Sequence, residues 1–215
     1  MRHAEMAVPL VTSRRRFLRS VSFAATAAVF AEAHLAVAVS QATANAASPV
    51  KLALDEERMR ALAAWTALTF DTPNPVPFGA EIFHSSSGER LMRAANAVGQ
   101  EHGPSAHAEL RTIRLACNKL NSHSLRGCTL YTTCEPCPMC MACALWADLD
   151  RVVFGATIAD AARFGHQIQV SAAEIARRSD MSCVVDGPVE RDRCLALFTN
   201  PKMQKAFKIR NPAKP

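Results

Sequence analysis

Residues 128–140 read CTLYTTCEPCPMC and hold the clearest structural signal in the chain. The first five residues are rich in β-branched and aromatic types, which predicts a short strand over 128–132. Pro138 suits the first position of a helix and disfavours helical geometry in the residue before it, so Cys137 is expected at the helix N-cap. Cys140 then follows one turn later. A strand that leads directly into a helix with two cysteines at its start therefore decides how this region folds.

Helices and strands alternate along the rest of the chain. Strands are expected over 80–84 and 90–94 around a Ser-Ser-Gly turn, and over 151–155 after a helix that ends near Asp148. This alternation favours an α/β sheet with helices on its faces. The other expected elements are a helix from Asp55 as N-cap to about Leu68 with an apolar stripe of Leu62, Trp65 and Leu68, a helix from Ser105 as cap to about Lys119, a helix over 171–178, a strand over 182–186, and a helical tail from Arg191 that Pro201 interrupts.

The size and composition of the chain fit one globular domain. It has 215 residues, of which 49% are hydrophobic and 20% charged, which argues against a disordered or fibrous protein. Its formal net charge of +6 would suit a nucleic acid or an anionic surface.

The N-terminal region has the pattern of an export signal. Residues 13–19 read SRRRFLR and precede an Ala-rich apolar stretch over 21–39 and small residues over 42–47. A basic region, an apolar region and a small-residue site, in that order, are typical of a signal peptide. The arginines followed by Phe-Leu resemble the twin-arginine signal of bacteria. We therefore expect residues 1–46 to be a twin-arginine signal peptide and residues 47–215 to be the mature, periplasmic or secreted domain.

The alternative for the N-terminal region is a membrane anchor. The apolar stretch is nearly long enough to span a bilayer, but Glu32 and His34 interrupt it and alanine makes it weakly hydrophobic. We therefore expect no stable membrane span after cleavage. The leader carries five arginines and two glutamates, so the mature chain keeps a net charge of only +3.

Two short segments carry the chemistry, His107-Ala108-Glu109 and the pair Cys137 and Cys140. Each alone is a weak signal, but together they match the H-x-E…P-C-x-x-C signature of zinc nucleobase deaminases. Zinc binds two thiolates and an imidazole readily, and three protein ligands leave a fourth position for water, which marks a catalytic site. We expect one Zn²⁺ per chain on His107, Cys137 and Cys140, with Glu109 as the general acid and base.

With these motifs in place, residues 77–166 resemble the cytidine deaminase superfamily, in its guanine deaminase and tRNA adenosine deaminase branch. The resemblance implies a three-layer α/β/α fold with a central five-stranded mixed sheet, zinc at two helix N-termini, and a homodimer. The stretches that carry it are PFGA at 77–80, Asn96, PSAHAE at 104–109, LYTTCEPCPMC at 130–140, Trp146 and RVVFGA at 151–156.

The same resemblance implies four substrate-binding residues. Asn96 would hydrogen-bond the base, the backbone of Ala108 would lie beside a base carbonyl, and Phe78 and Trp146 would contact the substrate. Taken by residue type alone, Phe78 and Trp146 suit core packing equally well, and Asn96 suits a turn.

The sequence also departs from the guanine deaminase pattern. Those enzymes carry acidic residues shortly after an Asp-Ala-Ala segment, whereas here residues 160–162 are followed by His166 and Gln167. His166 is most simply a surface histidine, and Cys134 a small buried apolar residue.

Cys183 and Cys194 form a further open question. In an oxidising compartment the two thiols could be joined in a disulfide, and the alternative is that both stay free.

Three classes of function remain. The first is a zinc-dependent hydrolase that deaminates a purine or related nucleobase or nucleoside, with guanine as the leading candidate. The second is a tRNA adenosine deaminase, although export and the small mature charge argue against a nucleic-acid substrate. The third is a zinc-stabilised binding protein without catalysis, which the presence of Glu109 argues against.

Overall fold

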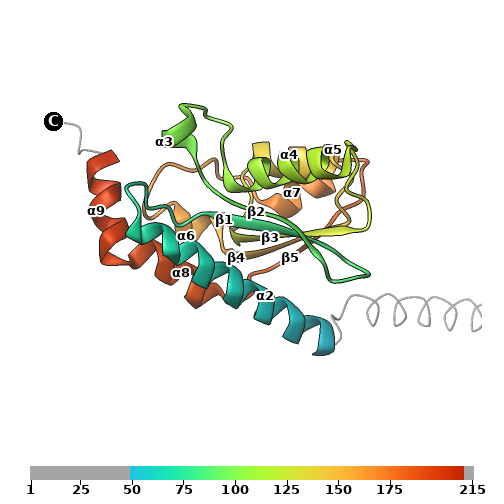
Figure 1. Ribbon diagram of the computed structural model, residues 1–215, viewed down its shortest axis with the longest axis horizontal. Coiled ribbons are helices and arrows are strands. Elements are labelled where there is room, and N and C mark those ends of the chain that lie inside the picture. Colours follow the sequence, from blue (N-terminus) through green and yellow to red (C-terminus); the bar gives the residue numbers. More distant parts are fainter. Residues whose placement is uncertain (1–48, 211–215) are drawn as a thin grey trace, which may run out of the picture. The chain divides into compact units, whose positions relative to one another are not determined.

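The computed structural model describes residues 49–210, so the predicted signal peptide lies outside the described residues. A five-stranded sheet with strand order β2-β1-β3-β4-β5 forms the centre (Figure 1). β1 pairs antiparallel with β2 and β3, whereas β3, β4 and β5 run parallel, so the sheet is mixed as predicted. The strands are β1 (Gly79–His84), β2 (Arg90–Ala95), β3 (Cys128–Cys134), β4 (Arg151–Ala156) and β5 (Val184–Asp186).

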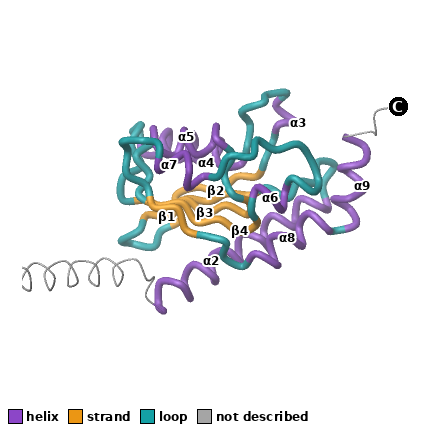
Figure 2. The backbone as a smooth tube through the Cα atoms, turned by 180° about the vertical axis from the view of Figure 1, so that it is seen from behind, coloured by secondary structure: helices purple, strands orange, loops and turns teal. Residues whose placement is uncertain are grey.

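Helices cover both faces of this sheet, which gives the predicted α/β/α layers (Figures 1 and 2). One face carries α2 (Pro49–Ala67) and α8 (Arg191–Thr199), and α9 (Pro201–Arg210) follows α8. The other face carries α4 (Ala108–Leu120), α5 (Pro138–Trp146) and α7 (Ala172–Arg177). The short elements are η1 (Leu68–Asp71), α3 (Val98–Glu101) and α6 (Ile158–Ala161).

Two hydrophobic cores follow from the alternation of side chains along the central strands. Leu130 and Val152 pack into the core beneath α4, α5 and α7, and their neighbours Tyr131 and Val153 pack into the core beneath α2 and α8. All residues of β3 and β4 are buried, as expected for central strands covered on both faces. These two strands therefore give the site a rigid base.

The predicted start of the first helix is wrong. Helix α2 begins at Pro49, and Asp55 lies within it with only 2% of its surface exposed. Its carboxylate accepts hydrogen bonds from the Arg151 guanidinium at 2.6 and 2.8 Å and from the Tyr131 hydroxyl at 2.6 Å. Asp55 is therefore a buried ion-pair partner and not a cap. The predicted helix end near Leu68 is confirmed within one residue, but Leu68 is exposed and so does not belong to a buried apolar stripe.

The predicted cap of the next long helix is wrong as well. Helix α4 begins at Ala108, and its N-cap is His107, whose backbone is extended at φ −67° and ψ 152°. Ser105 lies two residues before this position. The predicted start at Ser171 is confirmed, because its side chain accepts a hydrogen bond from the backbone of Glu174. The interruption at Pro201 is also confirmed.

Cys183 and Cys194 remain free thiols. Cys183 packs against the core beneath α4, α5 and α7, whereas Cys194 is buried in the core beneath α2 and α8. The sheet separates the two cores, so the structure does not support a disulfide between these residues.

Replacing Asp55 with Ala should lower the free energy of unfolding by about 3–5 kcal/mol, because it removes the fully buried partner of Arg151. Urea denaturation monitored by circular dichroism measures this loss. Glu56→Ala is the matched control on the same helix, since its pair with Arg60 is exposed and should contribute less than about 1 kcal/mol. Equal losses in the two variants would contradict the assignment.

The same ion pair predicts a pH dependence. Burial alone would raise the pKa of Asp55, but hydrogen bonds from Arg151 and Tyr131 outweigh it and hold that pKa below its ordinary value. The unfolded chain has an aspartate pKa of about 3.9, so the stabilisation is fully present above that pH. It is lost as the pH falls through the lower pKa of the folded state.

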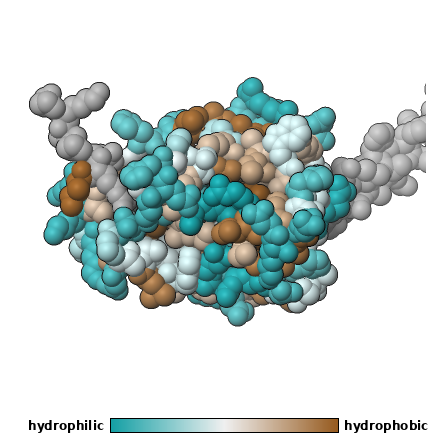
Figure 3. Space-filling view, turned by 45° about the horizontal axis from the view of Figure 1, so that its top comes forward, coloured by the Kyte–Doolittle hydropathy of each residue, from teal (hydrophilic) through white to brown (hydrophobic). Residues whose placement is uncertain are grey.

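Within residues 49–210, no helix combines the length and the apolar character that crossing a bilayer requires. The face of the molecule in Figure 3 shows hydrophobic residues scattered among hydrophilic ones. This is the usual exterior of a folded domain.

Candidate metal centre and substrate cavity

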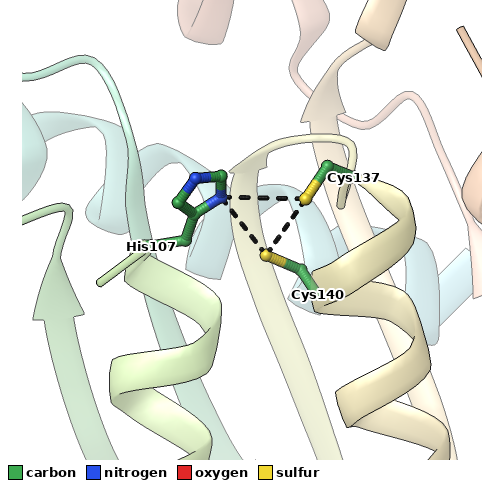
Figure 4. Close-up of side chains that lie close together, drawn as sticks. All are labelled: His107, Cys137 and Cys140. Atoms are coloured by element: carbon green, nitrogen blue, oxygen red, sulfur yellow. Dashed lines mark hydrogen bonds between the residues drawn. The ribbon is translucent and has the colours of Figure 1, made fainter. Parts of the chain in front are cut away.

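The three predicted metal ligands meet where α4 and α5 begin (Figure 4). His107 is the N-cap of α4, and Cys137 is the N-cap of α5 with an extended backbone at φ −64° and ψ 166°. Pro138 occupies the first turn of α5, as predicted, and Cys140 follows one turn after Cys137. The positive ends of the helix dipoles favour thiolates at this point.

The distances between the ligand atoms suit zinc. The two sulfur atoms are 3.5 Å apart, and His107 Nδ1 lies 3.7 Å from the sulfur of Cys137 and 3.4 Å from that of Cys140. In a tetrahedral site, zinc–ligand bonds of about 2.0–2.3 Å place sulfur atoms about 3.8 Å apart and sulfur about 3.5 Å from nitrogen. The donor set and its spacing therefore fit a tetrahedral zinc site.

The two thiols differ in how readily they ionise. Contact with Cys140, together with the hydrogen bond to His107, lowers the pKa of Cys137 to about 4. Contact with Cys137 and burial raise the pKa of Cys140 above its ordinary value. The low pKa favours the thiolate form of Cys137, and metal binding would release the proton that Cys140 holds.

Glu109 lies in the first turn of α4, two residues after the metal ligand His107. Its side chain is buried, and this burial raises the pKa of Glu109 to about 7. A carboxyl group with a pKa near neutrality can both accept and donate a proton, as the predicted general acid and base must. Because His107 precedes the helix with an extended backbone, both side chains reach the same cavity.

The cavity lies beyond the carboxyl ends of the parallel strands β3 and β4, where ligands of open α/β sheets commonly bind. Its volume is about 180 Å³. The lining residues are Phe78, Asn96, His107, Glu109, Cys134, Glu135, Cys137, His166 and Gln167.

The structure brings two of the four predicted substrate residues to the cavity wall. Phe78 lines the cavity, and its ring also packs edge-on against Phe198 of α8 at 5.3 Å between centroids. Asn96 lines it too, while its Oδ1 accepts a hydrogen bond from the backbone of Val98 at 3.1 Å. Both residues therefore make structural contacts, and their position on the cavity wall is compatible with the predicted substrate contacts. Ala108 is fully buried between His107 and Glu109.

The structure contradicts the core-packing alternative for Trp146, and its predicted substrate contact stays a prediction. This residue is the last of α5, whereas the metal ligands are at the start of that helix. Its side chain is 74% exposed and does not line the cavity of this chain, so it does not belong to the core.

Four residues that the sequence did not single out for this role also line the cavity. Cys134 ends β3 and Glu135 follows it directly, whereas His166 and Gln167 lie in a later loop between α6 and α7. His166 is exposed as predicted, yet it also borders the cavity. The signal that could have identified His166 and Gln167 is the departure from the guanine deaminase pattern at their positions.

The sequence of residues 53–156 matches the family described as the cytidine and deoxycytidylate deaminase zinc-binding region. Within the chain, 89 residues are 43% identical to guanine deaminase from Bacillus subtilis, which covers 41% of this chain and 56% of that protein. Over 81 residues it is 42% identical to a tRNA-specific adenosine deaminase from Aquifex aeolicus, which covers 38% of this chain and 52% of that protein. The chain thus spans about half the length of these two relatives.

The fold also matches solved structures. One is a mutant protein in complex with 8-azaguanine, with a TM-score of 0.61 and 25% sequence identity, over 69% of this chain and 84% of that one. The match covers a larger share of this chain than the family region does, so it includes residues outside that region. It agrees with the three-layer arrangement and the mixed sheet described above.

Proposed function

We propose that this protein, whose residues 53–156 match the cytidine and deoxycytidylate deaminase zinc-binding region, is a zinc-dependent aminohydrolase that releases ammonia from a purine nucleobase. Guanine is the first candidate substrate. The observation that carries the proposal is that two of the three zinc ligands, His107 and Cys137, line one small cavity together with the buried Glu109, whose pKa is raised to about 7.

His107, Cys137 and Cys140 hold the metal in this proposal. When bound, zinc supplies Lewis-acid chemistry at the amino-bearing ring carbon. Hydrolysis forms a carbon–oxygen bond from water and breaks the carbon–nitrogen bond to the amino group. The Glu109 carboxylate takes a proton from the attacking water and delivers protons to the ring nitrogen and the departing ammonia.

The remaining cavity residues would hold the base. Phe78 offers an aromatic face on which a flat heterocycle packs, and the Asn96 side chain offers an amide to a ring edge. The cavity of about 180 Å³ is smaller than the roughly 300–1,000 Å³ typical of pockets for drug-sized ligands. This size suits a single heterocyclic base.

A tRNA adenosine deaminase is the second candidate. Identity to the tRNA-specific relative is 42%, almost equal to the 43% found for guanine deaminase. His166 and Gln167 stand where guanine deaminases carry acidic residues, and this difference also weakens the case for guanine. A nucleic-acid substrate would have its target base flipped into the same cavity.

Ammonia release from a panel of substrates tests the proposal. The zinc-loaded full-length chain would be given guanine, adenine, cytosine, guanosine, adenosine and a tRNA anticodon stem-loop. We expect guanine to have a kcat/KM at least about tenfold above the others. Activity only on the stem-loop, with a steep salt dependence, would establish the second candidate. Release from none of them would leave a zinc-stabilised binding protein.

A further inference from the structure

A ten-residue connection joins α6 to α7 and brings two side chains to the cavity. Residues 162–170 of this connection have no helix or strand, and they carry His166 and Gln167. Within residues 49–210, neither side chain makes a hydrogen bond to another residue, so both are available to a ligand. The ring of Phe164 packs on Phe198 at 5.5 Å, which holds the first half of the loop against α8. A different side chain links the second half of the loop to the metal-ligand segment.

Glu135 provides that link. One oxygen of its carboxylate accepts a hydrogen bond from the backbone N–H of Ile158, and the other accepts one from the N–H of Ala172, both at 3.0 Å. Ile158 is the first residue of α6, and Ala172 is the first residue of α7. A single side chain therefore holds the helices at both ends of the loop, although Glu135 lies far from Ile158 and Ala172 in sequence.

These bonds do not replace the ordinary helix caps. The Thr157 side chain accepts a hydrogen bond from the N–H of Asp160 in α6, and the Ser171 side chain accepts one from the N–H of Glu174 in α7. Glu135 binds a different N–H group in each first turn. Its additional effect is to attach both helices to the segment that ends in the metal ligand Cys137.

We propose that Glu135 is a positioning residue for the substrate cavity. By holding both ends of the 162–170 loop next to the metal centre, it sets His166 and Gln167 at a fixed distance from the base that Glu109 acts upon. This role rests on the proposed deaminase function. In this arrangement His166 and Gln167 contact the exposed edge of the base, and the metal and Glu109 carry out the chemistry.

Glu135→Gln tests the proposal with the smallest change. The amide keeps one acceptor oxygen but turns an NH₂ group toward the other backbone N–H, so one loop end should detach. We expect amide hydrogen exchange over residues 158–172 to become about tenfold faster, as measured by mass spectrometry. With guanine as the probe, KM should rise about tenfold while kcat changes less than about threefold, and zinc content should stay at one per chain.

Two controls separate positioning from helix stability. Thr157→Ala and Ser171→Ala remove the ordinary caps of the same two helices and keep both Glu135 bonds. We expect both to lower the melting temperature while leaving the KM for guanine within about twofold. A KM rise equal to that of Glu135→Gln in these controls would overturn the proposal, as would unchanged exchange and KM in Glu135→Gln, or loss of zinc from that variant.

Ala172→Pro provides a second variant in case Glu135→Gln fails to fold. Proline is favoured at the first helical position, and it removes only the N–H that donates a hydrogen bond to Glu135. The preceding Ser171 is already extended at ψ 151°, as a residue before proline requires. It should reproduce the faster exchange and the higher KM, and wild-type values would count against the link. If wild-type protein releases no ammonia from any substrate of the panel, the proposed function fails, and the exchange data alone still decide whether Glu135 holds the loop.

Discussion

Glu109→Gln should lower kcat for ammonia release by about 10³-fold or more while the protein keeps one zinc per chain. The amide has nearly the same shape but can neither take a proton from water nor deliver one to the leaving nitrogen. Steady-state ammonia release and metal analysis of the same sample measure the two quantities together.

The matched control is the same substitution at a glutamate far from the metal centre. Glu57 is exposed on α2, on the face of the sheet opposite the metal centre, so Glu57→Gln should leave kcat within about twofold. Full activity in Glu109→Gln would rule out its role in proton transfer. A loss of zinc from Glu109→Gln would instead mean that Glu109 supports the metal.

Cys140→Ala should abolish both zinc binding and activity. Two ligands remain after this change, too few for the tetrahedral site that the three side chains form. We expect less than about 0.1 zinc per chain and a fall in kcat/KM of more than about 10³-fold. Because a bound metal stabilises only the folded state, the melting temperature should also stop responding to added zinc.

Cys143→Ala is the matched control on the same helix. Cys143 is half-buried one turn after Cys140, and it is not among the metal ligands. It should keep its zinc and most of its activity, with only a small loss of stability. Retention of zinc by Cys140→Ala would show that the metal is held elsewhere.

The strands could be predicted from the sequence because local residue types decide them. The β-branched and aromatic residues of 128–132 and the apolar residues of 151–155 belong to central strands, and both predictions are confirmed within two residues. Two helix starts failed because Asp55 and Ser105 have good capping side chains. A carboxylate before an apolar stripe gives no sign that its partner, Arg151, lies 96 residues away.

The metal ligands could be predicted because their spacing is itself structural. A proline after Cys137 fixes the helix start, and three residues later Cys140 lies on the same side. Glu135, His166 and Gln167 could not be found this way, because only the folded chain brings the 162–170 loop to the cavity. The core-packing alternative for Trp146 failed because residue type alone does not show which face of a helix is buried.

The packing of Phe78 against Phe198 has a consequence for how this protein could diverge. Phe78 and the zinc ligands lie inside the family region of residues 53–156, whereas Phe198, His166 and Gln167 lie after it. In the proposed function, the family region thus supplies the metal ligands and Glu109, and the later part of the chain shapes the cavity wall that would meet the base. Mutations after residue 156 are then expected to change which heterocycle is accepted without disturbing the metal, which gives evolution a separate means of changing preference.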